Sequence, residues 1–224
     1  MIEILDTWAK PLEKHLSDET FLKIGKEVAL KRKVEKVIPS TKEEMFRCFY
    51  ETPFNKVIGV IVGMDPYSTP GLADGLCFST SDNNKTPASL RKIHKAIEES
   101  CYDNFRPEQT NDLCYLAKQG ILMLNCSLSV AENVPGSHEE YWVEFSKAIF
   151  KTINDISYPV FILALGKSAQ KFTDLITNDI HQVIKVEHPA ASAYQNREWN
   201  YEDCFKKINN FMWTNYGPLS LIQW

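Results

Sequence analysis

Val57-Ile-Gly-Val-Ile-Val is followed at once by Gly63-Met-Asp-Pro-Tyr, and this stretch decides the fold. The first part is apolar and rich in β-branched residues, which predicts a strand buried on both faces. The Gly-x-Asp-Pro sequence is typical of a tight turn and predicts the end of that strand. The stretch therefore predicts a buried strand that delivers Asp65 to its carboxyl end.

Three similar apolar runs occupy residues 121–124, 160–165 and 183–186. Helical periods lie between them. Their apolar positions are Leu90, Ile93, Ala96 and Ile97, then Trp142, Phe145, Ile149 and Ile153, then Phe205, Ile208 and Met212. Thr86-Pro87 is predicted to supply the N-cap and first position of the first helix. Alternating strands and helices predict an α/β fold in three layers, α/β/α, with a central four-stranded parallel twisted sheet flanked by helices. We expect one domain over residues 1–224.

Composition excludes several classes of protein. The 25 Lys and Arg residues face 29 Asp and Glu residues, so a basic field over the whole protein is excluded. No apolar run approaches the ~20 residues of a membrane span, and the N-terminus has no signal-peptide pattern. The six cysteines form no C-x-x-C pair, which excludes zinc-ribbon and iron–sulfur spacings. We expect reduced thiols, a cytoplasmic location, no metal and no organic cofactor.

Polar residues follow each of the four apolar runs: Asp65, Asn125, Gly166-Lys167 and His188. Carboxyl ends of parallel strands share one edge, where open α/β sheets bind ligands, so we expect these residues to converge. A carboxylate there can stabilise a cation or act as a base. The Asn125 amide offers a donor and an acceptor to a ligand edge, and His188 can donate to a developing oxyanion.

Each residue also has a purely structural interpretation. Asp65 before proline can cap its own turn, and Asn125 can satisfy loop backbone groups. His188 can be a structural histidine. Phe78, a candidate for stacking on a planar ligand, can belong to the core. The conjunction at one edge favours a site.

The same residues lie in motifs that resemble family 1 uracil-DNA glycosylases. Gly63-Met-Asp-Pro-Tyr resembles the water-activating loop G-Q-D-P-Y-H, and residues 73–79, Ala-Asp-Gly-Leu-Cys-Phe-Ser, resemble the A-x-G-L-C-F-S run. Residues 118–125, Lys-Gln-Gly-Ile-Leu-Met-Leu-Asn, are similar to K-Q-G-V-L-L-L-N. His188-Pro-Ala-Ala-Ser-Ala-Tyr resembles the H-P-S-P-L-S loop. The resemblance runs in order from about Trp8 to Trp224.

The resemblance implies a monofunctional DNA glycosylase that flips uracil out of DNA and releases it in base-excision repair. Asp65 and His188 would be catalytic. Met64 (through its main chain), Tyr67, Phe78 and Asn125 would bind the base. Asn125 would read N3–H and O4, Tyr67 would exclude a C5 methyl group, and neutral His188 would donate to O2. The expected DNA contacts are Ser89, Lys167, Ser168, Pro189, Ala191, Ser192, Tyr194 and Arg197.

Four departures from the family pattern stand out: Met64 for Gln, Ser68 for His, Lys167 for Ser, and Ala191-Ser192 where the family inserts a Leu into the duplex. Neither Ala191 nor Ser192 fills the gap left by a flipped base, so we expect a preference for single strands. Tyr194 or Arg197 is the alternative wedge. The candidate phosphate-binding cations are Lys85, Arg91, Lys92, Lys167, Lys171 and Arg197, with Lys167 favoured by its place at a strand end.

Two other functions are left open by the sequence: a same-fold glycosylase for another modified pyrimidine, and a catalytically weak DNA-binding or replication scaffold. The expected partners are uracil-containing DNA, single- or double-stranded, and a protein inhibitor of uracil-DNA glycosylases or a replication partner. We expect no membrane association and a monomer. A bacterial or viral source is favoured, with a nuclear location if the source is eukaryotic.

Overall fold

A computed structural model describes residues 2–102, 109–194 and 197–224. Its central sheet has four parallel strands in the order β3-β2-β5-β6, which are Ile121–Asn125, Gly59–Gly63, Phe161–Leu165 and Gln182–Val186. These are the four strands that the apolar runs predict, and all neighbouring pairs are parallel. Strands β2, β3 and β5 are buried along their whole length, as expected when helices cover both faces.

The remaining elements lie around this sheet. The longer helices are α2 (Asp18–Lys31), α5 (Ala88–Cys101), α7 (Glu139–Asn154) and α10 (Cys204–Tyr216). The shorter helices are α1 (Ala9–Leu12), α3 (Lys42–Met45), α4 (Arg47–Glu51), α6 (Cys114–Lys118), α8 (Lys167–Gln170) and α9 (Ala191–Tyr194). The 3₁₀ turns are η1 (Ile2–Trp8), η2 (Phe54–Lys56), η3 (Thr173–Leu175) and η4 (Pro218–Ser220). Strands β1 (Val37–Ile38) and β4 (Val130–Ala131) form a separate antiparallel pair.

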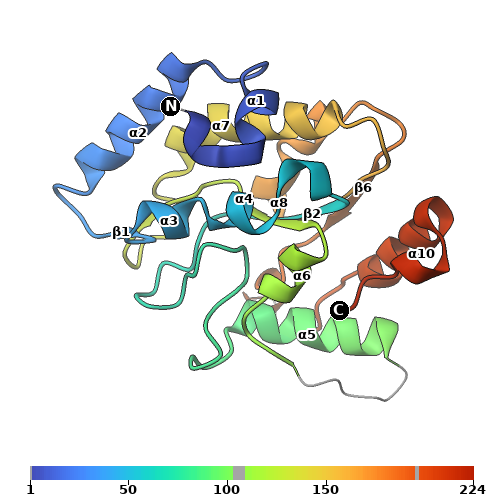
Figure 1. The fold of residues 1–224 in the computed structure, drawn as a ribbon. Helices are drawn as coiled ribbons and strands as arrows, with labels where there is room; N and C mark the ends of the chain where they lie inside the picture. The colour runs from blue at the N-terminus through green and yellow to red at the C-terminus, as the bar shows by residue number, and fades with distance from the viewer. Residues whose placement is uncertain (1, 103–108, 195–196) are drawn as a thin grey trace.

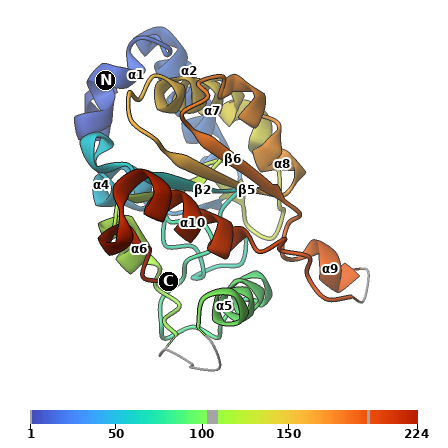
Figure 2. The same ribbon diagram turned by 90° about the vertical axis from the view of Figure 1, so that its right-hand side faces the viewer.

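The helices form two layers with the sheet between them. Helices α1, α2 and α7 lie on one face of the sheet, and α5 and α10 lie on the other (Figures 1 and 2). Helix α9 stands out from the body beyond the sheet in Figure 2. The three-layer α/β/α prediction is therefore confirmed.

The predicted helical faces point into the core. Trp142, Phe145, Ile149 and Ile153 of α7 are all buried, as are Phe205, Ile208 and Met212 of α10. One boundary prediction was wrong: α5 begins at Ala88, with Pro87 and not Thr86 as its N-cap. The Pro87 carbonyl accepts the first helical hydrogen bond, from the Arg91 amide, so the helix starts one residue later than Thr86-Pro87 predicts.

An aromatic cluster joins the N-terminal segment to α7. Trp8 contacts Phe49 edge-on with ring centroids 5.3 Å apart, and Phe49 contacts Phe145 of α7 at 5.8 Å. The indole N–H of Trp8 donates to the Thr52 carbonyl at 2.8 Å, so its one polar group is satisfied in the core. The same hydrophobic core runs from Leu5 to Trp224.

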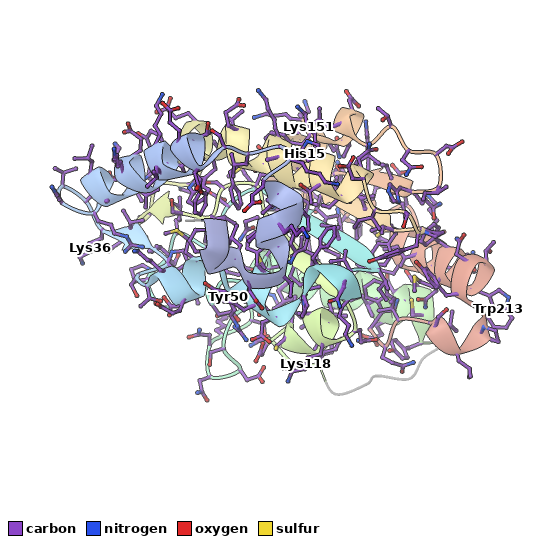
Figure 3. The ribbon with its side chains drawn as sticks, turned by 45° about the horizontal axis from the view of Figure 1, so that its top comes forward. His15, Lys36, Tyr50, Lys118, Lys151 and Trp213 are labelled. Carbon is purple, nitrogen blue, oxygen red and sulfur yellow. The ribbon has the colours of Figure 1, made fainter. Side chains whose placement is uncertain are left out.

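Charged side chains are spread over the outer surface. Lys36, Lys118 and Lys151 reach outward from three separate parts of the chain (Figure 3). Within the described ranges, every helix is too short or too polar to cross a membrane.

Candidate active site

The carboxyl ends of the four strands bring the predicted residues together. Gly63 at the end of β2 pairs in register with Asn125 at the end of β3. The Gly166 amide, just past β5, donates to the Val186 carbonyl at the end of β6 at 2.9 Å. A Cβ on Gly166 would lie 2.9 Å from the Cβ of His188, so the histidine packs directly over this glycine. The convergence predicted from the four apolar runs is confirmed for Asp65, Asn125, Gly166 and His188.

Gly63 forms a floor directly against the side chains of Asn125 and Phe78. A Cβ at this position would lie 2.9 Å from the Asn125 side-chain oxygen and 3.2 Å from the Phe78 ring, so only glycine allows both contacts. The Phe78 backbone has a φ of 63°, a left-handed conformation that a bulky residue rarely adopts. Tyr67 holds this residue by donating its hydroxyl to the Phe78 carbonyl at 2.9 Å. The ring of Phe78 lies 5.7 Å from that of His188.

The Asn125 amide has an environment that suits a ligand contact. The residue is 6% exposed. Within the part of the chain that the structure describes, its side chain makes no hydrogen bond. The amide satisfies no loop backbone group in the described part of the chain, so the loop-satisfying interpretation loses its support. Asn125 is left available to pair with a bound molecule.

Asp65 occupies a half-buried position at the start of the next loop. Its Oδ2 accepts the Gly136 backbone N–H at 2.6 Å. Burial raises the pKa of Asp65 to about 6, and the nearby charge of Glu139 adds to the rise, while the Gly136 hydrogen bond opposes it. The carboxylate therefore ionises just below neutral pH. Met64 beside it is pinned through its carbonyl, which accepts the Ser127 amide at 2.8 Å.

His188 is held as a neutral imidazole. Burial lowers the pKa of His188 below its usual value, which favours the uncharged ring at neutral pH. Its Nδ1 accepts the Ala190 backbone N–H at 3.1 Å, so the ring proton sits on Nε2. The side chain therefore presents a hydrogen-bond donor from its far nitrogen.

The raised pKa of Asp65 predicts a pH dependence for the reaction that the sequence resemblance implies. We expect kcat/KM to fall about tenfold per pH unit below roughly pH 6, because protonation removes the Asp65 negative charge. The check is a pH–rate profile on the uracil-containing oligonucleotide that the resemblance implies as substrate. Glu139→Gln removes the neighbouring charge and should move this limb to lower pH. A limb near the usual aspartate value, unchanged in Glu139→Gln, would contradict this assignment.

The candidate phosphate contacts differ in how free they are. Lys167 is exposed at the start of α8, and within the described ranges it forms no ion pair. Ser168 next to it donates to Glu139 Oε1 at 3.4 Å, and Lys171 pairs with the other oxygen of the same carboxylate at 3.1 Å. Ser89 is half-buried in the first turn of α5. Of these two lysines, Lys167 is therefore the one that could meet a phosphate without first breaking an ion pair.

The loop after His188 corrects part of the sequence interpretation. Ser192 is fully buried, and its hydroxyl donates to the Pro189 carbonyl at 3.1 Å, so it offers no side chain to DNA. Pro189 is buried too, while Ala191 keeps part of its surface. The guanidinium of Arg197 is engaged on both oxygens of Glu187. The Tyr194 side chain lies outside the described part of the structure.

Sequence reasoning missed two residues at the site. Gly136 supplies the backbone N–H that holds Asp65, and Glu139 places a second carboxylate beside that glycine. Both belong to the Gly-Ser-His-Glu stretch at 136–139. Gly136 lies 71 residues along the chain from Asp65. Backbone hydrogen bonds across such a separation depend on the fold and leave no signal in residue type.

The fold is that of the uracil-DNA glycosylases. The crystal structure of mimivirus uracil-DNA glycosylase superimposes with a TM-score of 0.84 at 22% identity, covering 97% of this chain and 87% of that one. A variant of the mimivirus enzyme, solved in complex with UGI, gives a TM-score of 0.83 with 96% and 88% coverage at the same identity.

Sequence relatives settle the family. The chain is 35% identical over 213 residues to uracil-DNA glycosylase 1 of Listeria innocua, covering 95% of each. It is 36% identical over 177 residues to uracil-DNA glycosylase of Streptococcus mutans, covering 79% of each. No protein-family model matches the chain. On these relatives, the chain belongs to the uracil-DNA glycosylase family.

Proposed function

We propose that the protein hydrolyses the N-glycosidic bond of deoxyuridine flipped out of DNA, which releases uracil and leaves an abasic site for base-excision repair. The observation that carries this proposal is the unpartnered Asn125 amide beside the Phe78 ring on the Gly63 floor. An aromatic face for stacking and an amide for edge reading are what a flipped base requires. Family membership supports the same activity.

Base selection rests on Asn125 and Tyr67. The Asn125 amide can donate to uracil O4 and accept from N3–H at once. Cytosine presents the opposite pattern there, so its binding would leave buried polar groups unpaired. The Tyr67 hydroxyl donates to the Phe78 carbonyl, and we expect this side chain to crowd a methyl group at C5 and so exclude thymine.

Bond cleavage divides between Asp65 and His188. As the bond breaks, positive charge develops on the sugar and negative charge on uracil. The Asp65 carboxylate stabilises the sugar cation and orients the attacking water. The Nε2–H of neutral His188 donates to uracil O2. Water is the nucleophile, so the product strand stays intact and the enzyme is monofunctional. Within the described residues no group of three or more His, Cys, Asp or Glu side chains is placed to hold a metal ion.

The test uses oligonucleotides that differ in one base. We expect free uracil from a uracil-containing strand, no base from matched thymine and cytosine strands, and strand cleavage only after alkali treatment. Cleavage before alkali would contradict the monofunctional assignment. Release of another modified pyrimidine in place of uracil would favour the same-fold alternative, and binding without release would favour the scaffold alternative.

Strand preference follows from the small side chain of Ala191. We expect a higher kcat/KM on single-stranded than on matched duplex uracil DNA, because Ala191 cannot fill the space that a flipped base leaves in the stack. Ala191→Leu should raise the duplex rate with little change on single strands. A clear duplex preference in the wild type, unaffected by Ala191→Leu, would contradict this prediction.

The finer assignments are proposals of the same kind. We propose a single domain over residues 1–224, supported by the one core that runs from Leu5 to Trp224. We propose a monomer, because strand ends of this one chain supply Asp65, Asn125 and His188 without a gap that a second copy would have to fill. A protein inhibitor such as the UGI bound to the mimivirus enzyme is a proposed partner, and cytoplasmic DNA is the proposed setting.

A further inference from the structure

The segment that carries His188 projects from the body and needs an anchor. It comprises residues 187–194 and 197, and its helix α9 stands out from the body in Figure 2. Its internal ties are short: the Ala191 amide donates to the His188 carbonyl at 2.9 Å, and the Arg197 amide donates to the Ser192 carbonyl at 3.1 Å. These bonds shape the segment but do not attach it to the helices beside it.

Lys92 of α5 supplies an attachment. Its ammonium donates to the Ser192 hydroxyl, 100 residues away along the chain. That side chain is fully buried, and its hydroxyl donates a hydrogen bond to the Pro189 carbonyl at 3.1 Å. Pro189 directly follows His188. A continuous chain of hydrogen bonds therefore runs from α5 to the residue next to the imidazole.

The charges around Lys92 favour this internal role. The positive charge of Lys92 helps to lower the pKa of Glu187, which the Arg197 guanidinium lowers most. Lys92 is half-buried on α5, and its ammonium lies close to Ser192 and Glu187 of the His188 segment. A lysine engaged in this way must break its bond to Ser192 before it can neutralise a DNA phosphate.

We propose that Lys92 is a positioning residue that fastens the His188 segment to α5 through Ser192 and thereby fixes the imidazole for uracil departure. The proposal rests on the proposed function and replaces the interpretation of Lys92 as a phosphate contact. It also gives Ser192 an internal role in place of a DNA contact. Helix α5 carries the expected phosphate contact Ser89 in its first turn, so the Lys92–Ser192 hydrogen bond, hereafter the tie, links that helix to the His188 segment.

The kinetic test compares Lys92→Met with Ser192→Ala and the double variant. We expect each single variant to lower kcat on single-stranded uracil DNA about tenfold, since small misplacement of a catalytic group is costly. The double variant should be no worse than the worse single variant, because both break the same tie. Lys95→Met is the matched control. Lys95 lies one turn after Lys92 on α5 and pairs with Glu198, so this variant removes an equal charge without touching Ser192. It should stay within about twofold of wild type.

Salt dependence separates positioning from phosphate binding. If Lys92 binds Ser192 and no phosphate, the dependence of log KM on log salt concentration should have the same slope in Lys92→Met as in wild type. A raised KM with a flatter salt slope and unchanged kcat would overturn the proposal in favour of a phosphate contact. Strictly additive effects of Lys92→Met and Ser192→Ala would overturn it too.

Hydrogen exchange provides a readout that needs no catalysis. The amides of Ala190 and Ala191 should exchange faster in Lys92→Met than in wild type or Lys95→Met, because their bonds to His188 depend on the tie. Unchanged exchange with an unchanged melting temperature would overturn the proposal. If wild type released no uracil, the proposed function would fail while this measurement still reported on the tie.

Discussion

Asp65→Asn is expected to lower kcat for uracil release by at least ~10³-fold while KM for DNA changes by less than about threefold. Asn has the shape of Asp and keeps an oxygen for the Gly136 N–H, so the loop geometry is preserved. What disappears is the negative charge that stabilises the sugar cation in a half-buried site. Because that interaction exists mainly in the transition state, the loss falls on kcat.

The same variant should be more stable than wild type. Burial raises the Asp65 pKa above its unfolded value, so stability due to this group is fully present below the unfolded pKa and is lost as pH rises through about 6. At about pH 7.5 the buried charge is a net cost, and Asp65→Asn should raise the free energy of unfolding by ~1–3 kcal/mol. Denaturant titrations at two pH values check this. If wild type and Asp65→Asn had the same free energy of unfolding at neutral pH and also in acid, the pKa of Asp65 would not be raised.

Asn125→Ala should reduce kcat/KM for uracil DNA by about 10²–10³-fold. The variant loses both hydrogen bonds to the base edge and opens space beside the Phe78 ring. Inhibition by free uracil should weaken in parallel, because the product uses the same amide. The measurements are steady-state rates and uracil inhibition constants.

Asn55→Ala is the matched control for Asn125→Ala. Asn55 is exposed in η2, just before the amino end of β2 and so opposite the carboxyl edge of the sheet, and its replacement should leave both constants unchanged. If Asn125→Ala retained wild-type rates and uracil inhibition, the Asn125 amide would not read the base. The structural interpretation of this residue would then return.

The parallel sheet and the convergence of its strand ends followed from short-range patterns. Buried parallel strands are continuously apolar, so residues 57–62 and 121–124 marked β2 and β3 without knowledge of their partners. Asp65, Asn125 and His188 could be placed together because parallel strands end at a common edge. The family motifs then attached chemistry to these positions.

Hydrogen bonds between distant segments could not be predicted from the sequence. Nothing in residue type announces that Gly136 holds Asp65 or that Lys92 reaches Ser192, because those contacts arise only when distant segments pack. Ser192 was expected at the DNA surface because Ala191-Ser192 occupies the place of the Leu that the resembled family inserts into the duplex. Its burial depends on a bond to Pro189 and a cation from α5. Strands β1 and β4 have only two residues each, too few for any periodic pattern.

The central claim is that Asp65, at the carboxyl edge of the sheet, drives uracil excision without a metal. One labelled oligonucleotide with a single uracil, incubated with wild type or Asp65→Asn in EDTA and then treated with alkali, tests it most directly. The account predicts cleavage at uracil by wild type and at least ~10³-fold less by Asp65→Asn, which remains folded. Equal cleavage by both proteins, or no cleavage by folded wild type, would contradict it.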